Sequence, residues 1–387
     1  MSLHKYITQR QIVKERLSRK SVTDIVTRKI PYLLKPTKIS LEQSDKVFAS
    51  QWLDEQKVVC GTKSNQLYVI DMKTKKRVNI PTLEGSEESV MPDVSTGIHD
   101  IQINEKKLLA TSGENPNHLA VYRIPTFDPV CVGEAHTDWV FATEWIDDNH
   151  VTTGSRDGSI ALWEIPVMCS ATPASSLPGI RPPVIAPLST LKSNLSTNRI
   201  RDLAFNNKTG HLAALSPLAF IHIWDMISEK QVEVVPLPFH HENVCLAFQE
   251  ECSLYAVGSQ SHVSLLDAKT SKPIHNVMTN DIGAGVRSVS FKDMMVTIGT
   301  GHGSVYFYDI RANRFLSKPT QELFYLRSGK GWLRPDSTLF DYFTDQDTEC
   351  FRNAIYTHCY DPTGTKLFTA GGPLALVLYG NYAALWE

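Results

Sequence analysis

The chain has 387 residues, a formal net charge of −2 and 42% hydrophobic residues. This composition argues against a disordered chain, and the near-neutral charge argues against a globally basic nucleic-acid-binding protein. Seven cysteines are scattered without a C-x-x-C pair, which favours reduced thiols in the cytosol or nucleus over disulfides or a zinc knuckle. The N-terminus is too polar for a signal peptide, and no run of about 18 apolar residues predicts a transmembrane helix.

The N-terminal segment differs from the rest of the chain. Residues 1–38 hold ten Lys or Arg against two acidic residues, a formal charge of +8. Leu3, Tyr6 and Ile7 begin an apolar stripe at roughly helical spacing, and a polar break and a second short stripe follow. The pattern predicts a helix-break-helix over residues 1–29. One interpretation is a solvated basic arm, and the other is a docking element that folds onto a partner.

The stretch 136–164 has the landmarks of one WD40 unit, which is three strands of a β-propeller blade. His136 precedes the inner strand, Asp157 lies in a Gly-containing turn, and Trp163 lies on the third strand. We expect these side chains and a threonine of the second strand to form a structural tetrad of hydrogen bonds.

The same pattern recurs along the chain, and seven copies predict an all-β, seven-bladed WD40 propeller with an N-terminal helical docking segment. The copies are 46–73, 97–124, 136–165, 199–226, 242–269, 286–311 and 354–387. The last copy lacks an outer strand, which residues 30–41 can supply, so the propeller is expected over residues 30–387. Such closure removes bare strand edges.

Two spacers interrupt the repeats. Residues 166–198 are rich in Pro, Ser and Thr, which predicts a flexible surface loop over 166–183 followed by an outer strand near 184–191. Residues 312–353 are rich in aromatic side chains, which predicts an ordered insertion packed on a propeller face.

No nucleotide-binding, metalloprotease or serine-hydrolase motif is present, so we expect no catalysis, no cofactor and no metal site. His358 and Cys359 lie side by side on an inner strand and therefore point to opposite faces, which prevents their acting together. The sequence predicts a protein that binds partners.

Six cations from four repeats are expected around one opening of the propeller. They stand either before the turn between the second and third strands or at the start of an inner strand, and they are Lys46, Lys63, Arg156, Arg199, Arg201 and Arg287. Such a cluster predicts a compact pocket for carboxylates or phosphates. The alternative is that acids such as Asp157 or Asp202 neutralise these cations.

A second signal is Tyr308-Asp309-Ile310-Arg311, which ends a third strand and points to the opposite face. A Trp-Asp-x-Arg ending is typical of WD-repeat proteins that dock on the adaptor of cullin-4 ubiquitin ligases, and here Tyr replaces Trp.

A connected set of motifs extends this likeness over nearly the whole chain. It comprises KVFASQWL (46–53), VVCGTK (58–63), DPVCVG (128–133), GSRDGS (154–159), ENVCLA (242–247), VRSVSF (286–291), GTGHGS (299–304), FYDIRA (307–312), GKGWL (329–333), YTHCYD (356–361) and GNYAALW (380–386). Together these motifs resemble the factor-twelve family of substrate receptors associated with the DNA-damage-binding adaptor and cullin-4. Arg199 stands where that family usually has Lys.

The resemblance implies a non-catalytic receptor that recruits proteins for ubiquitination by binding C-terminal degrons ending in two glutamates. It implies that the six cations bind this degron. It also implies that Asp309, Arg311 and the N-terminal residues Leu3, Tyr6 and Ile7 bind the adaptor, with cullin-4 and the RING subunit bound indirectly. A cytoplasmic and nuclear location is expected.

Two other functions compete with this one. A scaffold could read phosphorylated or other acidic motifs through the same cations without any ligase. Nucleic-acid binding through the basic arm is disfavoured because aromatic residues are nearly absent from it, so neither a nucleic acid nor a membrane is an expected partner.

Overall fold

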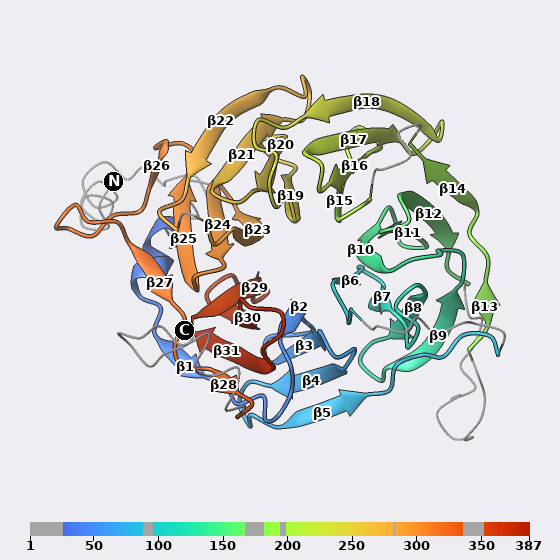
Figure 1. Cartoon of the computed structure of the whole chain (residues 1–387), viewed down its shortest axis with the longest axis horizontal. Coiled ribbons are helices and arrows are strands. Elements are labelled where there is room, and N and C mark those ends of the chain that lie inside the picture. The colour runs from blue at the N-terminus through green and yellow to red at the C-terminus, as the bar shows by residue number, and fades with distance from the viewer. Residues whose placement is uncertain (1–25, 88–95, 167–181, 194–198, 282, 336–351) are drawn as a thin grey trace, which may run out of the picture.

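The computed structural model describes residues 26–87, 96–166, 182–193, 199–281, 283–335 and 352–387. Seven antiparallel sheets stand around a central channel as the blades of a propeller, each with its first strand innermost (Figure 1). No helix among these residues is long and apolar enough to cross a membrane. The predicted seven-bladed, all-β propeller is confirmed.

Blades 1 to 3 follow the repeat closely, and each repeat copy forms the three inner strands of its blade. Blade 1 comprises β2 (Val47–Trp52), β3 (Lys57–Thr62), β4 (Leu67–Asp71) and β5 (Arg77–Ile80). Blade 2 comprises β6 (Ile101–Ile103), β7 (Leu108–Ser112), β8 (Leu119–Arg123) and β9 (Asp128–Gly133), with β13 (Val184–Ile185) added in parallel to β9. Blade 3 comprises β10 (Val140–Trp145), β11 (His150–Ser155), β12 (Ser159–Glu164) and β14 (Ser189–Lys192).

Blades 4 to 6 continue around the ring. Blade 4 comprises β15 (Asp202–Asn206), β16 (His211–Ser216), β17 (Phe220–Asp225) and β18 (Lys230–Pro236). Blade 5 comprises β19 (Cys245–Gln249), β20 (Leu254–Gly258), β21 (His262–Asp267) and β22 (Pro273–Met278). Blade 6 comprises β23 (Val286–Lys292), β24 (Met295–Thr300), β25 (Ser304–Asp309) and β26 (Arg314–Phe315), with β27 (Tyr325–Arg327) also paired to β25.

Blade 7 joins the two ends of the chain and closes the ring. Its strands are β29 (Asn353–Tyr360), β30 (Leu367–Pro373), β31 (Gly380–Trp386) and β1 (Pro36–Lys38), and β28 (Trp332–Leu333) also pairs with β31. Thr37 lies opposite Leu385 in the antiparallel pair, and Ile39 donates a backbone hydrogen bond to Ala383 at 3.0 Å. The closing strand therefore comes from the expected segment, residues 30–41.

The described part of residues 312–353 is ordered. Its strands β26, β27 and β28 pair with the outer edges of blades 6 and 7. Tyr325 packs on Tyr306 of β25 with ring centroids 5.4 Å apart, so the aromatic composition reflects edge packing. Residues 336–351 of the predicted insertion, and residues 167–181 of the predicted flexible loop 166–183, lie outside the described residues.

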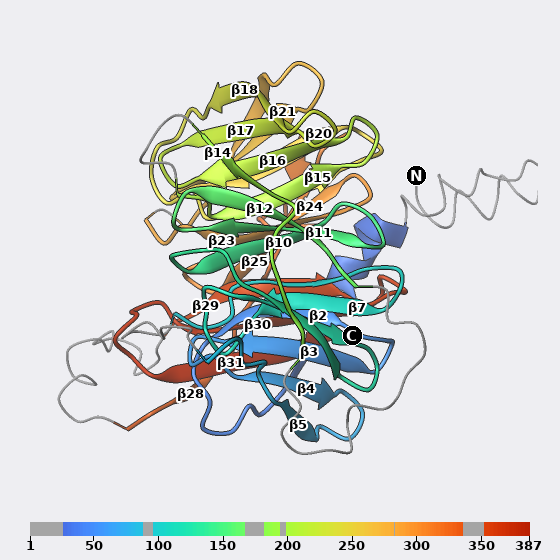
Figure 2. The same ribbon diagram turned by 90° about the vertical axis from the view of Figure 1, so that its right-hand side faces the viewer.

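A short helical turn precedes the propeller. Residues 26–29 are helical and lead into the 3-10 turn η1 (Ile30–Tyr32), which lies on the right-hand side of the ring in Figure 2. The Arg28 guanidinium contacts the Asp309 carboxylate, with Nε 2.6 Å from Oδ2, and the Tyr32 hydroxyl donates to the Ser317 carbonyl at 2.7 Å. These contacts hold the turn against blade 6.

Candidate functional site

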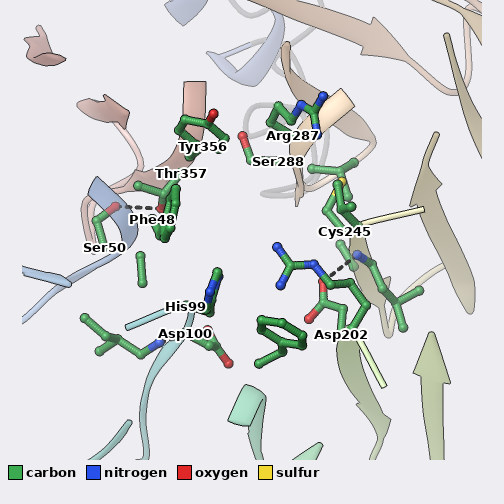
Figure 3. A pocket seen from close by; sticks show the side chains of 18 of the residues that line it. Phe48, Ser50, His99, Asp100, Asp202, Cys245, Arg287, Ser288, Tyr356 and Thr357 are labelled. Carbon is green, nitrogen blue, oxygen red and sulfur yellow. Dashed lines mark hydrogen bonds between the residues drawn. The ribbon is translucent and has the colours of Figure 1, made fainter. Parts of the chain in front are cut away.

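A cavity of ≈ 1060 Å³ occupies the centre of the ring and is lined by residues of all seven inner strands or of the turns before them (Figure 3). One position of the repeat sends a side chain into it from every blade. The seven residues are Phe48, His99, Phe141, Arg201, Val244, Arg287 and Tyr356. We call this level of the channel the mouth.

Bulges in the inner strands aim several of these side chains. The ladder between the first and second strands skips one residue at Phe48, Phe141, Arg287 and Tyr356. A bulge bends a strand and redirects the extra side chain. His99, Arg201 and Val244 instead precede their inner strands, although the backbone N–H of Arg201 still bonds to the Leu215 carbonyl of β16 at 2.8 Å.

Aromatic rings form one side of the mouth. His99 stacks on Phe48 with ring centroids 4.9 Å apart, and its edge meets Phe141 at 4.7 Å. Tyr356 meets the other side of Phe48 at 5.0 Å. Burial, with the nearby Arg201 charge, lowers the pKa of His99 well below its usual value, so this ring is a neutral member of the wall. Blades 7, 1, 2 and 3 thus contribute one continuous aromatic arc.

Cations form the other side of the mouth. The Arg201 guanidinium lies 4.4 Å from the centroid of the Phe141 ring, and burial lowers its pKa from the usual value. Arg287 Nη2 donates to Glu242 Oε2 at 2.6 Å, and Arg287 Nε donates to the Ala284 carbonyl at 3.2 Å. Arg287 and Tyr356 come from neighbouring inner strands and lie at the edge of the same cavity (Figure 3).

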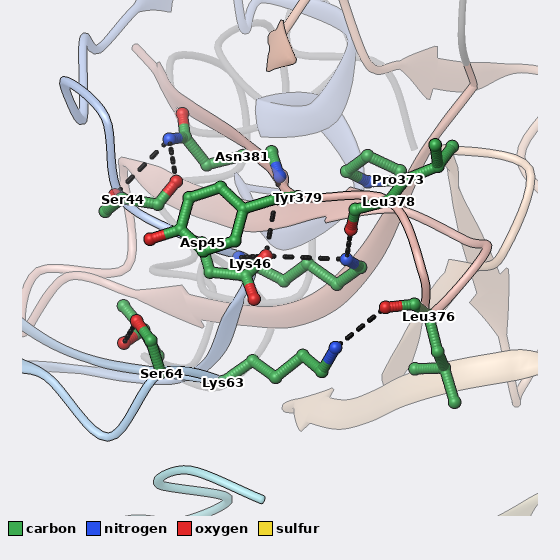
Figure 4. A network of polar contacts seen from close by, with 12 residues as sticks. Ser44, Asp45, Lys46, Lys63, Ser64, Pro373, Leu376, Leu378, Tyr379 and Asn381 are labelled. Carbon is green, nitrogen blue, oxygen red and sulfur yellow. Dashed lines mark hydrogen bonds and ion pairs between the residues drawn. The ribbon is translucent and has the colours of Figure 1, made fainter. Parts of the chain in front are cut away.

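Lys63 reaches the cavity from the turn after β3. Its ammonium donates to the Leu376 carbonyl at 2.7 Å, in the loop that joins β30 to β31 (Figure 4). The backbone N–H of Lys63 bonds to the Lys46 carbonyl, and that of Arg156 bonds to the Trp139 carbonyl, each at 2.9 Å. The matching bonds place Lys63 and Arg156 at the same position of their blades, on the same face of the ring.

Lys46, one of the six predicted cations, does not line the cavity. The side chain is fully buried beneath the β30–β31 loop, and its ammonium donates to the Leu378 carbonyl and lies 3.4 Å from Asp45 Oδ1. Burial lowers the pKa of Lys46, against the opposing influence of Asp45. This lysine holds the loop in place, as Figure 4 shows.

Arg156 and Arg199 do not line the cavity. Arg156 Nε lies 3.6 Å from Asp138 Oδ2, and its guanidinium lies 4.4 Å from the centroid of the Trp139 ring. Arg199 is exposed just before blade 4. The structure therefore brings together Lys63, Arg201 and Arg287 of the six predicted cations.

Acids partner some of the cations. Glu242 pairs with Arg287, and Asp138 pairs with Arg156. Of the two acids named from the sequence, Asp157 bonds to His136, whereas the charge of Asp202 favours the charged form of Arg201 while its carboxylate accepts the backbone N–H of Leu246 at 2.6 Å.

Three half-buried carboxyls also line the cavity, on Asp100, Glu144 and Asp202. Burial and the Asp100 charge raise the pKa of Asp202 to about 7 and that of Glu144 to about 8. Burial also raises the pKa of Asp100, although Thr143 donates two hydrogen bonds to it. A neutral floor at lower pH becomes a negative one as the pH rises.

The opposite face carries Arg311, which follows the end of β25. That strand begins after the turn beside the mouth, where Gly301 bonds to the Gly285 carbonyl. Six strand residues span about 17 Å, so Arg311 is a channel length away from Lys63. Asp309 is buried at 4% exposure, forms an ion pair with Arg28 and accepts the backbone N–H of Arg311. Leu3, Tyr6 and Ile7 lie outside the described residues.

The predicted tetrad residues lie together in blade 3. Trp163 Nε1 donates to Thr153 Oγ1 at 2.8 Å, and His136 Nε2 lies 2.6 Å from the same oxygen. His136 Nδ1 lies 3.2 Å from Asp157 Oδ2. Burial opposes ionisation of Asp157, but the hydrogen bonds from His136 and Ser159 outweigh it and hold the pKa well below its usual range.

Sequence reasoning missed Glu242 and the aromatic arc. A signal for the arc was available, because each mouth residue stands four positions before the aromatic or aliphatic end of its inner strand, as Phe48 stands before Trp52. Among the described residues, no three His, Cys, Asp or Glu side chains are placed to hold a metal ion. The cations at the mouth are suited to binding an anion.

The chain is similar to known proteins in two comparisons. Residues 30–387 match the model of the DDB1- and CUL4-associated factor 12 beta propeller. The chain is also 19% identical, over 299 residues, to a guanine nucleotide-binding protein subunit beta of Saccharomyces cerevisiae. That alignment covers 76% of this chain and 55% of the yeast protein, so the chain spans about half the length of this relative. Because the family model covers the whole propeller, the chain belongs to the DDB1- and CUL4-associated factor 12 beta-propeller family.

Proposed function

We propose that this protein is the substrate-recognition subunit of a cullin-4 RING ubiquitin ligase and binds protein C-termini that end in two glutamates. It carries out no reaction itself and presents the bound protein for ubiquitination and proteasomal degradation. Family membership supports the receptor role. The observation that carries the ligand assignment is the convergence of Lys63, Arg201 and Arg287 on one end of the channel.

Charge matching favours a chain end over an internal acidic motif. A Glu-Glu terminus carries three carboxylates, two on side chains and one on the main chain, and the mouth presents three cations from blades 1, 4 and 6. An internal Glu-Glu lacks the third carboxylate. The cations lie in a partly desolvated cavity, where such ion pairs are stronger than on an open surface.

The side chains that line the channel also affect how far a bound peptide can enter it. The methylene groups of a glutamate can pack on the arc of Tyr356, Phe48, His99 and Phe141 while its carboxylate faces the arginines. Below the mouth, Asp202 and Glu144 gain negative charge as the pH rises through about 7 and about 8, and only then oppose a further carboxylate.

The adaptor-binding surface is proposed on the opposite face, at Arg311 and the N-terminal segment 1–29. Arg28 fixes the end of that segment beside β25 through its ion pair with Asp309. Cullin-4 and the RING subunit are then bound through the adaptor, in the cytoplasm and the nucleus.

The test is binding of short fluorescent peptides by fluorescence polarisation. We expect binding of a peptide ending in Glu-Glu, and strong loss of binding when its terminus is amidated or changed to Gln-Gln. Lys63→Ala, Arg201→Ala and Arg287→Ala should each weaken binding at least tenfold, since removing one desolvated partner of a charge pair costs about 2–5 kcal/mol. Lys106→Ala is the matched control, because this exposed lysine pairs with Asp148 and does not line the cavity.

Two outcomes would contradict the proposal. Equal affinity for the free and amidated Glu-Glu peptides would remove the terminal carboxylate from recognition. Binding only of a phosphorylated, amidated peptide would identify the mouth as a reader of phosphorylated motifs instead.

A further inference from the structure

Of the three cations that line the cavity, Arg287 already forms an ion pair with an acidic side chain of the protein, that of Glu242. Glu242 lines the cavity from the segment before β19, and its Oε2 accepts a hydrogen bond from Arg287 Nη2 at 2.6 Å. The Glu242 side chain is 38% exposed and that of Arg287 is 18% exposed, so the acid lies on the solvent side of the arginine. Any carboxylate that enters the mouth meets Glu242 at Arg287.

The backbone around this ion pair is built to hold it. Glu242 has a φ of 56°, in the left-handed region that residues other than glycine rarely adopt. The residue packed against the pair is Gly285, at a φ of 73°, and a Cβ there would lie 2.5 Å from Glu242 Oε2 and 2.9 Å from Arg287 Nη2. Side-chain atoms at position 285 would displace the carboxylate from the guanidinium.

We propose that Glu242 is an internal competitor for the ligand's carboxylate, and that it sets the affinity and the selectivity of the mouth. This inference rests on the proposed function. A ligand with one carboxylate gains little at Arg287, because it only replaces an existing ion pair. A ligand with two or three carboxylates also gains Lys63, whose ammonium donates to the Leu376 carbonyl, and Arg201, whose guanidinium lies over the Phe141 ring. The acid whose charge acts most strongly on Arg201 is Asp202, which accepts the backbone N–H of Leu246. Glu242 therefore selects for chain ends with several negative charges.

The alternative is that Glu242 only orients Arg287 for the ligand. The two roles predict opposite effects of Glu242→Gln, which keeps the size of the side chain and removes its charge. As a competitor, Glu242 weakens binding, so the variant should bind more tightly. As an orienting residue, it supports binding, so the variant should bind more weakly.

The experiment measures affinities of the full chain for peptides ending in Glu-Glu and in Gln-Glu. We expect Glu242→Gln to raise affinity for the Glu-Glu peptide about tenfold and for the Gln-Glu peptide by more, which narrows the ratio between them. The gain should vanish when Arg287 is also changed to Ala, because the competition acts through that guanidinium. Asp138→Asn is the matched control, since it removes an equal charge from a carboxylate that pairs with Arg156 outside the cavity.

Each remaining outcome overturns the proposal. Unchanged or weaker binding by Glu242→Gln, with an unaltered melting temperature, would assign Glu242 an orienting role. A gain that persists in the Arg287→Ala background, or that Asp138→Asn reproduces, would be a general effect of net charge. Failure of the wild type to bind either peptide would overturn the proposed function, and this inference with it.

Discussion

The carboxyls beneath the mouth make ligand binding sensitive to pH. Asp202 and Glu144 are half-buried, and their pKa values are raised to about 7 and about 8. A glutamate-ended peptide is fully ionised above about pH 6, because the pKa of a solvent-exposed Glu side chain is about 4.3. Between pH 6 and pH 9 only the channel floor gains negative charge, so the repulsion that the peptide meets increases with pH.

We predict that affinity for a Glu-Glu peptide falls roughly three- to tenfold from pH 6 to pH 9, the size of a change of about 1 kcal/mol from one added charge nearby. Glu144→Gln stays neutral throughout and should flatten the upper part of this profile. Binding curves at half-unit pH intervals provide the measurement, with Glu250→Gln at an exposed turn as the control. A Glu144→Gln profile identical to that of the wild type would mean that the floor does not influence the mouth.

The same raised pKa has a defined effect on folding. Folded Glu144 keeps its proton up to about pH 8, whereas the unfolded chain releases it near pH 4.5. The folded state therefore binds more protons over this interval, and its stability declines as the pH rises through it. Denaturant unfolding of Glu144→Gln should show a shallower decline between pH 5 and pH 8 than the wild type.

The location of a side chain could be predicted from the sequence where its position in the repeat alone determines that location. It could not be predicted where a loop distant in sequence covers the side chain. Arg201 and Arg287 lie at the predicted end of the channel because every blade places that position there. Lys46 has an equally suitable position but is covered by residues 374–378, more than 300 positions away. No local pattern contains that contact.

At the scale of elements, the closing strand is short but decides whether the ring is continuous. β1 contributes only three paired residues, yet the chain after it buries Ile39 and Leu41 in the core shared by blades 7 and 1. Burial of these side chains, together with backbone bonds such as that from Ile39 to Ala383, holds the ends of the chain together.

We predict that Ile39→Ala lowers the free energy of unfolding by about 2–5 kcal/mol, because the side chain is 2% exposed and its removal leaves a cavity. Leu33→Ala is the control, since Leu33 is 71% exposed and its loss should change stability by no more than about 0.5 kcal/mol. Urea denaturation monitored by tryptophan fluorescence provides both values. Equal effects of the two changes would mean that the closing strand does not contribute to the stability of the ring.

Elements with a strong repeat could be predicted, and irregular ones could not. In the three inner strands of each blade, apolar residues either alternate with polar ones or form a continuous apolar segment between two turns. Such patterns predict strands from local sequence alone. The outer strands β26, β27 and β28 are two or three residues long, and they pair with strands of blades 6 and 7 that are chosen by the closed ring. The aromatic residues of the segment 312–353 predicted that it packs on the propeller, but they did not identify the strands against which it packs.

At the scale of the whole molecule, the channel separates two surfaces that carry different chemistry. Lys63, Arg201 and Arg287 gather at one end of the channel, whereas Arg311 and the Arg28–Asp309 ion pair lie past the far ends of the strands. A rigid ring of seven blades connects the two surfaces. A receptor needs this separation, because a substrate and an adaptor must be bound at the same time.

We therefore predict that substitutions on the two faces have independent effects. Arg311→Ala should lose co-purification of the adaptor and cullin-4 from cells while the purified protein keeps its affinity for a Glu-Glu peptide. Lys63→Ala should do the reverse, because its ammonium lies at the mouth, where it bonds to the Leu376 carbonyl. Affinity purification scores the first property and fluorescence polarisation the second. Loss of both properties in either variant, with normal thermal unfolding, would show that the faces are coupled and that the ring is not a passive spacer.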